Sequence, residues 1–183
     1  DFSAKDVAKR QPAKLAAMEA HFKTEEKAPL IIGGVPDEKT ETVKYALRIP
    51  GGLSFLAHGN FNAKVTGLDA IPKSERPPVA IVHYAFQVMV LLGVGMMLIA
   101  IFYLFVLWRK KGWLEKRWLL KLFVIAIPAG FIAVEAGWIV TEVGRQPWIM
   151  YGYMRTIDAV TPMPGIVYSF YIFTAVYLSL AFI

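Results

Sequence analysis

The sequence contains no cysteine and only three histidines among its 183 residues. Without thiolates, the chain cannot hold a thiolate-ligated metal or an iron–sulfur cluster, and it cannot attach haem through a CxxCH motif. Histidine, methionine and glutamate remain as the side chains suited to ligate a metal. We therefore expect any metal site in this chain to use these three residue types.

Long apolar runs are distributed unevenly along the chain. Hydrophobic residues make up 56% of the sequence, above the ~45–50% that is usual in soluble domains. Residues 1–78 are polar and charged, whereas residues 79–183 contain three long apolar runs, at about 79–108, 118–141 and 166–183. Because a bilayer is spanned by about 20 apolar residues, this pattern predicts an all-α polytopic membrane protein with three transmembrane helices and an N-terminal loop region.

The charge distribution indicates how these helices are oriented. The formal net charge is +6, and five basic residues crowd the short loop between the first two apolar runs: Arg109, Lys110, Lys111, Lys116 and Arg117. Short cytoplasmic loops are enriched in Lys and Arg, so the cluster predicts membrane topology and not binding to nucleic acid. Three spans then put residues 1–78 on the outer side of the membrane as an external region.

The polar N-terminal region divides into two parts. Residues 1–28 are predicted to form an exposed amphipathic helix, because apolar residues recur there at helical spacing and Pro12 suits a first helical turn. Residues 29–78 are rich in Gly and Pro, which predicts loops and turns with at most short strands, such as Thr42–Ile49.

An acidic cluster ends the second apolar run. Glu135 and Glu142 are seven residues apart, which puts them on one helix face about 10 Å from each other along the axis. Arg145 follows at the membrane rim, and Pro147 ends the helix. A charge inside a bilayer costs roughly 2.5–3.5 kcal/mol on insertion scales, so it rarely persists without a function. Glu135 is compatible with two roles, a proton relay or a hydrogen bond between helices.

Polar side chains also occur near the start of the first apolar run. His83 and Gln87 are four residues apart and share a helix face, and Met89 lies two to three turns below the outer surface. A methionine in a membrane helix usually serves packing, and interfacial polar groups need no ligand. These residues therefore have two interpretations, membrane packing and ligand binding.

Three motifs resemble one known family. Gly144-Arg145-Gln146-Pro147-Trp148, preceded by Glu142, resembles a signature of subunit I of the cytochrome bd-type quinol oxidases. Residues 11–19, QPAKLAAME, resemble the quinol-loop motif of that family, and residues 86–90, FQVMV, resemble the segment that supplies a haem methionine. The motifs follow the family's order, so the chain resembles the C-terminal part of that subunit, from the quinol loop onward.

The resemblance implies a set of ligands and sites. Met89 would be an axial ligand of a low-spin b haem, whose partner histidine would lie in the N-terminal part of the subunit. Glu142 would ligate a high-spin b haem, and Arg145 would hold haem propionates or Glu142 itself. Lys14 and Glu19 would form the quinol site, with Glu19 as the acceptor of a quinol proton.

The same resemblance extends to other residues and to haem d, whose ligand is expected outside this chain. Trp148 and Trp138 would pack near the haems. Gln87 stands two residues before the haem methionine, at a cofactor-side position where relatives often carry a cation. Any contact of Gln87 with a propionate therefore lacks that charge.

The implied function is that of a haem-containing quinol:dioxygen oxidoreductase subunit in the bacterial cytoplasmic membrane. Quinol would be oxidised at the outer face, and electrons would pass through the low-spin haem to the high-spin haems that reduce dioxygen to water. Proton motive force would arise without pumping. The implied partners are the remaining N-terminal part of the subunit, a homologous second large subunit, a small single-helix subunit and membrane lipid.

Two other classes of protein stay open at the level of the sequence. A proton-coupled membrane transporter would use Glu135 and Glu142 for its coupling site and would show no haem absorbance. A purely structural subunit would account for the apolar helices but would leave the acidic cluster without a role.

Overall fold

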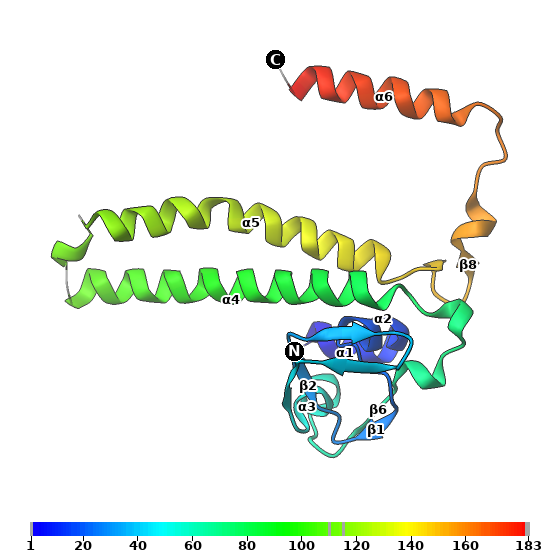
Figure 1. Cartoon of the computed structure of the whole chain (residues 1–183), viewed down its shortest axis with the longest axis horizontal. Helices are drawn as coiled ribbons and strands as arrows, with labels where there is room; N and C mark the ends of the chain where they lie inside the picture. The colour runs from blue at the N-terminus through cyan, green and yellow to red at the C-terminus, as the bar shows by residue number, and fades with distance from the viewer. Residues whose placement is uncertain (1, 110, 115, 182–183) are drawn as a thin grey trace.

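The structure is a computed structural model that describes residues 2–109, 111–114 and 116–181. Two long antiparallel helices lie side by side, a small mixed region packs against the start of the first, and a third apolar helix stands apart (Figure 1). Lys110 of the predicted basic loop and the last two residues of the predicted third span lie outside the described residues.

Short helices and strand pairs make up the N-terminal region. Its helices are α1 (Phe2–Arg10), α2 (Pro12–Met18) and α3 (Gly52–His58), with 3-10 turns η1 (Leu68–Ala70) and η2 (Lys73–Glu75). Its strands form three antiparallel pairs: β1 (Glu25–Glu26) with β6 (Lys64–Val65), β2 (Leu30–Ile32) with β5 (Leu47–Ile49), and β3 (Val35–Asp37) with β4 (Thr42–Lys44). The short strands agree with the prediction for residues 29–78, although Thr42–Ile49 is divided into β4 and β5, whereas helix α3 was not predicted.

The helical stretch at the N-terminus is shorter than the predicted 1–28. α1 ends at Arg10 because the residue before a proline is disfavoured in the α conformation, and Gln11 has φ −140° and ψ 64°. Pro12 then opens α2, as predicted. α2 ends at Met18, and the φ of 47° at Ala20 turns the chain away. Glu19 is therefore carried at a helix end.

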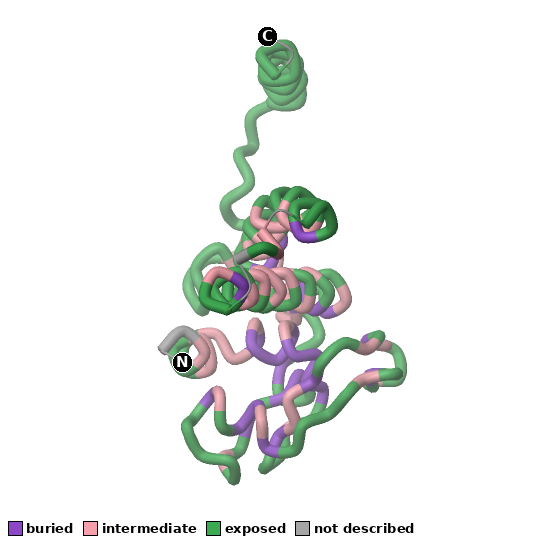
Figure 2. The backbone as a smooth tube through the Cα atoms, turned by 90° about the vertical axis from the view of Figure 1, so that its left-hand side faces the viewer, coloured by how far each residue is buried: buried purple, intermediate pink, exposed green. Residues whose placement is uncertain are grey.

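Two apolar clusters hold the N-terminal region together. The first joins α2 to η1, to strands β2 and β4, and to the start of the first long helix, and it consists of Ala13, Ala16, Ala20, Phe22, Ile31, Val43, Leu68, Ile71 and Val79. The second joins α2 to α3 and β6 through Leu15, Ala28, Leu53, Ala57 and Val65. Figure 2 shows that the buried residues concentrate here. Since α2 contributes to both clusters, its position is fixed from two sides.

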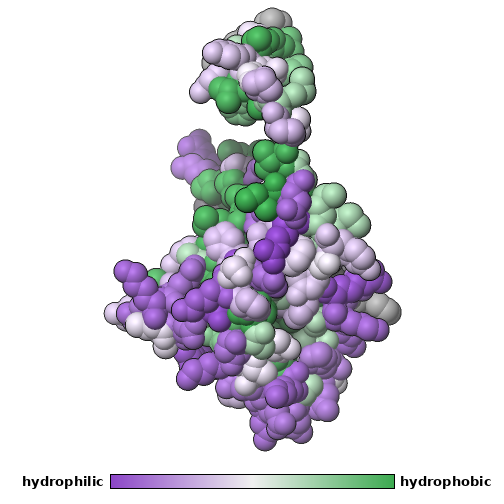
Figure 3. Space-filling model, turned by 90° about the vertical axis from the view of Figure 1, so that its right-hand side faces the viewer, coloured by the Kyte–Doolittle hydropathy of each residue, from purple (hydrophilic) through white to green (hydrophobic). Residues whose placement is uncertain are grey.

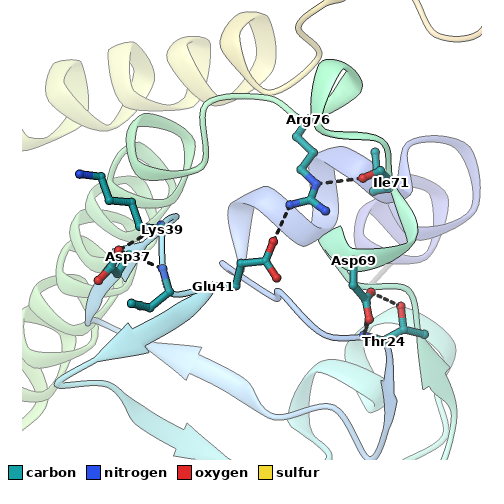
Figure 4. A network of polar contacts seen from close by, with 8 residues as sticks. Thr24, Asp37, Lys39, Glu41, Asp69, Ile71 and Arg76 are labelled. Carbon is teal, nitrogen blue, oxygen red and sulfur yellow. Dashed lines mark hydrogen bonds and ion pairs between the residues drawn. The ribbon is translucent and has the colours of Figure 1, made fainter.

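Polar contacts tie the linker that leads into the first long helix to the rest of this region (Figure 4). The Arg76 guanidinium donates to the Ile71 carbonyl oxygen at 2.9 Å and pairs with the Glu41 carboxylate at 2.9 Å. The backbone N–H and the hydroxyl of Thr24 both donate to the Asp69 carboxylate. These contacts fix the linker and with it the start of the long helix.

The two long helices are α4 (Val79–Arg109) and α5 (Arg117–Val143), joined through η3 (Lys111–Trp113). Both are long and apolar enough to cross a membrane. The 31 residues of α4 correspond to about 46 Å at 1.5 Å per residue, more than the roughly 30 Å of a hydrocarbon core. α5 continues through Pro128 as one helix and curves along its length (Figure 1).

The rest of the chain is a hairpin followed by an apolar helix. β7 (Trp148–Met150) pairs with β8 (Met154–Arg155), and η4 (Thr156–Ala159) leads toward α6 (Ile166–Ala181). α6 is apolar but has 16 residues, shorter than α4 and α5. Figure 3 shows hydrophilic residues over the N-terminal region and hydrophobic ones on the helices above it. Such apolar surface requires lipid or further helices as its surroundings.

Candidate functional site

Lys14 brings the QPAKLAAME segment against the GRQPW motif. A Cβ built on Gly144 would lie 3.2 Å from the Lys14 Cγ and 3.4 Å from its Cε, so the lysine stem runs along that glycine. The pKa of Lys14 is lowered, mainly by burial and further by the charge of Arg145, while Glu142 acts in the opposite direction. Two of the three predicted motifs therefore meet at this contact.

A small cavity lies at the same junction. Its volume is about 30 Å³, and its lining includes Lys14, Glu75, Arg145 and Trp148. This is room for an ordered water, and the lining groups supply the polar partners that such a water needs. The junction between the two motifs is thus polar and closely packed.

Glu142 is held by the arginine three residues further on. The Arg145 Nη2 donates to the Glu142 Oε1 at 2.8 Å, and the Arg145 Nε donates to the Thr141 carbonyl oxygen at 3.3 Å. The Glu142 side chain is 52% exposed in this chain. The carboxylate is therefore oriented by a cation and is still accessible to a group outside the chain.

Glu135 lies on the same uncovered face of α5 as Glu142. At 100° per residue, both glutamates lie roughly 140–160° around the helix from Gly137, which faces α4. Glu135 is exposed, as is its neighbour Trp138, at 63%. The face of α5 that carries both carboxylates is thus directed away from α4.

Met89 lies at the contact between α4 and α5. Its sulfur would be 3.1 Å from a Cβ built on Gly137, so the glycine leaves the space that the thioether occupies. Met89 and the two glutamates therefore belong to different sides of α5.

Glu19 lines a large apolar cavity beside α4. The cavity measures about 600 Å³ and is bounded by the segment 30–33, by Leu56 and by α4 residues from Phe86 to Val94. The Glu19 side chain is 4% exposed, and its Oε2 has no hydrogen-bond partner among the described residues. Burial raises the pKa of Glu19 to about 7, although a backbone hydrogen bond from Ile31 opposes the shift.

The structure does not bring Lys14 and Glu19 into one cavity. Lys14 lines the small polar cavity at Gly144, and Glu19 lines the apolar cavity at α4. The helix end at Met18 separates them. The two residues of the predicted quinol site therefore have different surroundings.

Gln87 and His83 use their polar atoms within the protein. Gln87 accepts from the Gly33 N–H at 3.1 Å and donates to the Ile31 carbonyl oxygen at 3.0 Å. His83 is fully buried, with Nδ1 at 2.9 Å from the Met18 carbonyl oxygen and Nε2 at 3.2 Å from that of Gly33. Both residues thus connect α4 to the N-terminal region.

Trp148 packs within the β7–β8 hairpin. The Arg155 guanidinium carbon lies 5.0 Å from the centre of the indole, and the Tyr151 ring meets it edge to face at 5.9 Å. Arg155 also bonds to Glu75 at 2.9 Å, which ties the hairpin to η2. The indole Nε1 is buried without a hydrogen-bond partner among the described residues.

Two residues of this site were not predicted from the sequence. Gly33 supplies two backbone hydrogen bonds to α4, and Gly137 supplies the space for the Met89 sulfur. Two features of the sequence could have indicated them. The Gly33-Gly34 pair suits a left-handed backbone, and Gly137 is a glycine within an apolar helix, where it allows close packing.

The donor set suits haem better than a bare metal ion. Within the described residues, no group of three or more His, Asp or Glu side chains is arranged to hold a metal ion. Met89 and Glu142 are single donors on different sides of α5, and a single donor is what one axial position of a haem iron requires. Gly137 leaves room for the Met89 sulfur, and Arg145 orients the Glu142 carboxylate.

Comparison with known proteins gives consistent relatives. The family model described as cytochrome bd terminal oxidase subunit I matches residues 1–183. Two Bacillus subtilis (strain 168) proteins are similar. A cytochrome bd menaquinol oxidase subunit I is 45% identical, and the match covers 96% of this chain and 39% of the relative. A cytochrome bd ubiquinol oxidase subunit 1 is 34% identical, and the match covers 87% of this chain and 36% of the relative.

A solved structure agrees with these relatives. The bd oxidase from Geobacillus thermodenitrificans superposes with a TM-score of 0.86 at 46% identity, covering 99% of this chain and 41% of the solved one. The chain spans about two fifths of the length of the relatives it matches. The three motifs, their contacts, the family model and the superposition agree, and the chain belongs to the cytochrome bd terminal oxidase subunit I family.

Proposed function

We propose that this chain is the C-terminal part of a haem-containing quinol:dioxygen oxidoreductase subunit, and that quinol is oxidised beside Glu19. One observation carries the proposal: the buried carboxyl group of Glu19 lines an apolar cavity, and α4, the helix that holds Met89, forms one wall of that cavity. The Bacillus subtilis relatives are named as menaquinol and ubiquinol oxidases, which supports a quinol as substrate.

Glu19 is suited to accept a proton from a quinol. Oxidation of a quinol to a quinone releases two electrons and two protons, and a base must receive each proton. A carboxyl group with a pKa of about 7 exchanges protons near neutral pH. Its Oε2 has no other partner among the described residues, so it is free to accept a hydroxyl proton. The apolar walls suit the ring and tail of a lipid-soluble substrate.

Met89, Glu142 and Arg145 are proposed to serve haem groups. When bound, the haems (a low-spin b, a high-spin b and a haem d) carry the electrons and reduce dioxygen to water. Met89 supplies a soft thioether ligand for the low-spin b haem, which favours a higher potential. Glu142 supplies a carboxylate ligand for the high-spin b haem, and Arg145 fixes the orientation of that carboxylate.

Lys14, Trp148, Trp138 and Glu135 take supporting roles in this proposal. Lys14 adds positive charge beside the Glu142–Arg145 pair and closes the junction at Gly144. Trp148 anchors the hairpin next to that junction. Trp138 and Glu135 share the uncovered face of α5, where Trp138 would pack near a haem and Glu135 would relay protons or bond to another helix.

The proposed topology accounts for energy conservation without a pump. Residues 1–78 lie on the outer side of the bacterial cytoplasmic membrane, and α4, α5 and α6 cross it, so quinol protons leave outside. Protons for water come from the cytoplasm. The rest of subunit I, a second large subunit and a small single-helix subunit complete the complex. Membership of an oxidase family gives no support to a proton-coupled transporter built on Glu135 and Glu142.

The test is a reduced-minus-oxidised visible spectrum of the intact purified complex. We expect Met89→Leu to remove the low-spin b signal selectively and Glu142→Ala to remove a high-spin signal. Glu19→Gln should keep both signals and lose quinol oxidation. Unchanged haem bands in the first two variants would contradict the ligand assignments, and a fully active Glu19→Gln variant would contradict the quinol site.

A further inference from the structure

We propose that Gln87 and His83 are positioning residues that hold Glu19 at a fixed place relative to Met89. The inference rests on the proposed quinol site and adds how that site is attached to the helix that carries Met89. It concerns the contacts that two side chains of α4 make with the backbone around Glu19: two hydrogen bonds of the Gln87 amide, and the His83 ring between two carbonyl oxygens.

The Gln87 amide is fully used by one short segment of backbone. Its oxygen accepts from the Gly33 N–H at 3.1 Å, and its nitrogen donates to the Ile31 carbonyl oxygen at 3.0 Å. This orientation of the amide is the one that matches a donor to each acceptor. Ile31 and Gly33 flank the end of β2, so Gln87 fixes that strand end on α4.

His83 adds a second attachment one helical turn earlier. Its ring is fully buried, and its two nitrogens face the carbonyl oxygens of Met18 and Gly33 at 2.9 and 3.2 Å. Gly33 is thereby held through its N–H by Gln87 and through its carbonyl oxygen by His83. Its φ of 69° is in the left-handed region, which a glycine adopts readily.

These attachments reach Glu19 from two directions. Met18, which His83 holds, directly precedes Glu19 in the chain. Ile31, which Gln87 holds through its carbonyl oxygen, gives a backbone hydrogen bond to the Glu19 carboxyl group. A movement of Glu19 relative to α4 therefore requires one of these bonds to break.

The same helix turn carries Met89, two residues beyond Gln87. Two residues correspond to about 3 Å of rise along the helix. α4 thus fixes both the carboxyl group that would receive a quinol proton and the thioether that would hold the electron-accepting haem. Gln87 borders the cavity as well, but in this role it acts through its hydrogen bonds to the backbone of Ile31 and Gly33, which distinguishes it from a ligand to a propionate.

The experiment uses the intact complex with Gln87→Leu, Gln87→Glu and His83→Gln, and with Ile81→Val as a control on the exposed side of α4. Gln87→Leu removes both hydrogen bonds, whereas Gln87→Glu keeps the acceptor for Gly33 and loses the donor to Ile31. Three quantities are measured: amide hydrogen exchange in the peptide covering residues 30–34, the reduced-minus-oxidised spectrum, and KM and kcat with a soluble quinol.

We expect Gln87→Leu to accelerate exchange at residues 30–34 and to raise KM by roughly 10-fold, the size of a lost supporting contact. The low-spin haem signal should be retained, and kcat should fall less than KM rises. Gln87→Glu should give a smaller effect in the same direction, His83→Gln should also accelerate exchange, and Ile81→Val should change none of the three quantities.

Two outcomes would overturn the proposal. One is unchanged exchange in both Gln87 variants, since the attachment would then not depend on the amide. The other is accelerated exchange with an unchanged KM, since the attachment would then not position the quinol site. Failure of the quinol site itself is distinguished by Glu19→Gln, which would stay active in that case while the exchange result would still report on the attachment.

Discussion

The stem of Lys14 lies against the bare Cα of Gly144, so the N-terminal region and the end of α5 are in direct contact. A Cβ at Gly144 would meet the Lys14 Cγ at 3.2 Å and would overlap the backbone oxygen of Val140. The glycine of the GRQPW motif is thus required by close approach and not by a left-handed backbone, since its φ is −69°.

Gly144→Ala should destabilise the complex. The added methyl group collides with a backbone atom that cannot rotate away, and overpacking of this kind typically costs about 1–3 kcal/mol. The measurement is the temperature at which the haem absorbance is lost. Gly93→Ala is the matched control, because no described residue, apart from its chain neighbours and the backbone of its own helix, lies within 4 Å of its Cβ position. Equal melting temperatures for the two variants would contradict the close approach.

Gly137→Ala should weaken the low-spin haem signal without reducing the stability of α5. The new Cβ would lie 3.1 Å from the Met89 sulfur and would displace it, although alanine itself favours a helix by about 1 kcal/mol over glycine. Gly130→Ala is the control, because its Cβ would be 3.9 Å from the Met96 sulfur, an ordinary contact. A spectrum that changes equally in both variants would argue against a special role for the Met89 sulfur.

The sequence predicted the parts of this protein that depend on local patterns. The predicted spans at 79–108 and 118–141 fall on α4 and α5, and Pro12 opens a helix as expected. Length and hydropathy decide such segments, so neighbouring residues carry enough information. The family resemblance drawn from three short motifs was confirmed by the family model.

The contacts between distant segments could not be predicted in this way. Lys14 and Glu19 are five residues apart, which gives no indication that they line different cavities until the helix end at Met18 is known. The bonds from Gln87 to segment 31–33 join residues more than fifty positions apart. Periodicity reports on one element at a time, and these contacts depend on how two elements pack.

The pH dependence of quinol oxidation should reveal Glu19. Only the ionised carboxylate can accept a proton, and the pKa is about 7, so kcat/KM should rise with pH through neutrality and level off above it. Glu19→Gln should remove this ascending limb together with most of the activity, whereas Asp6→Asn, at an exposed carboxylate that does not line the cavity, should keep it. An identical limb in the Glu19→Gln variant would assign the titration to another group.

The same titration has a consequence for stability. Glu19 has a folded-state pKa of about 7, above the 4.5 of an ordinary glutamate, so between these values the unfolded chain binds fewer protons than the folded one. The stability of the N-terminal region should therefore decrease as pH rises from about 4.5 to about 7 and then become constant. Hydrogen exchange at residues 30–34 across this pH range, corrected for intrinsic rates, measures the effect, and Glu19→Gln should abolish it.

Lys14 and Glu19 should contribute independently, because they lie in different cavities. Lys14→Met removes a positive charge beside Arg145 and Glu142, so it should perturb the high-spin haem signal and leave the ascending pH limb of Glu19 in place. Glu19→Gln should do the opposite. In the double variant, the two changes in the free energy of activation should add to within about 0.5 kcal/mol, as expected for sites without shared partners. A coupling energy well above that value would contradict the separate placement of Lys14 and Glu19, because the two side chains depend on each other only if they share surroundings.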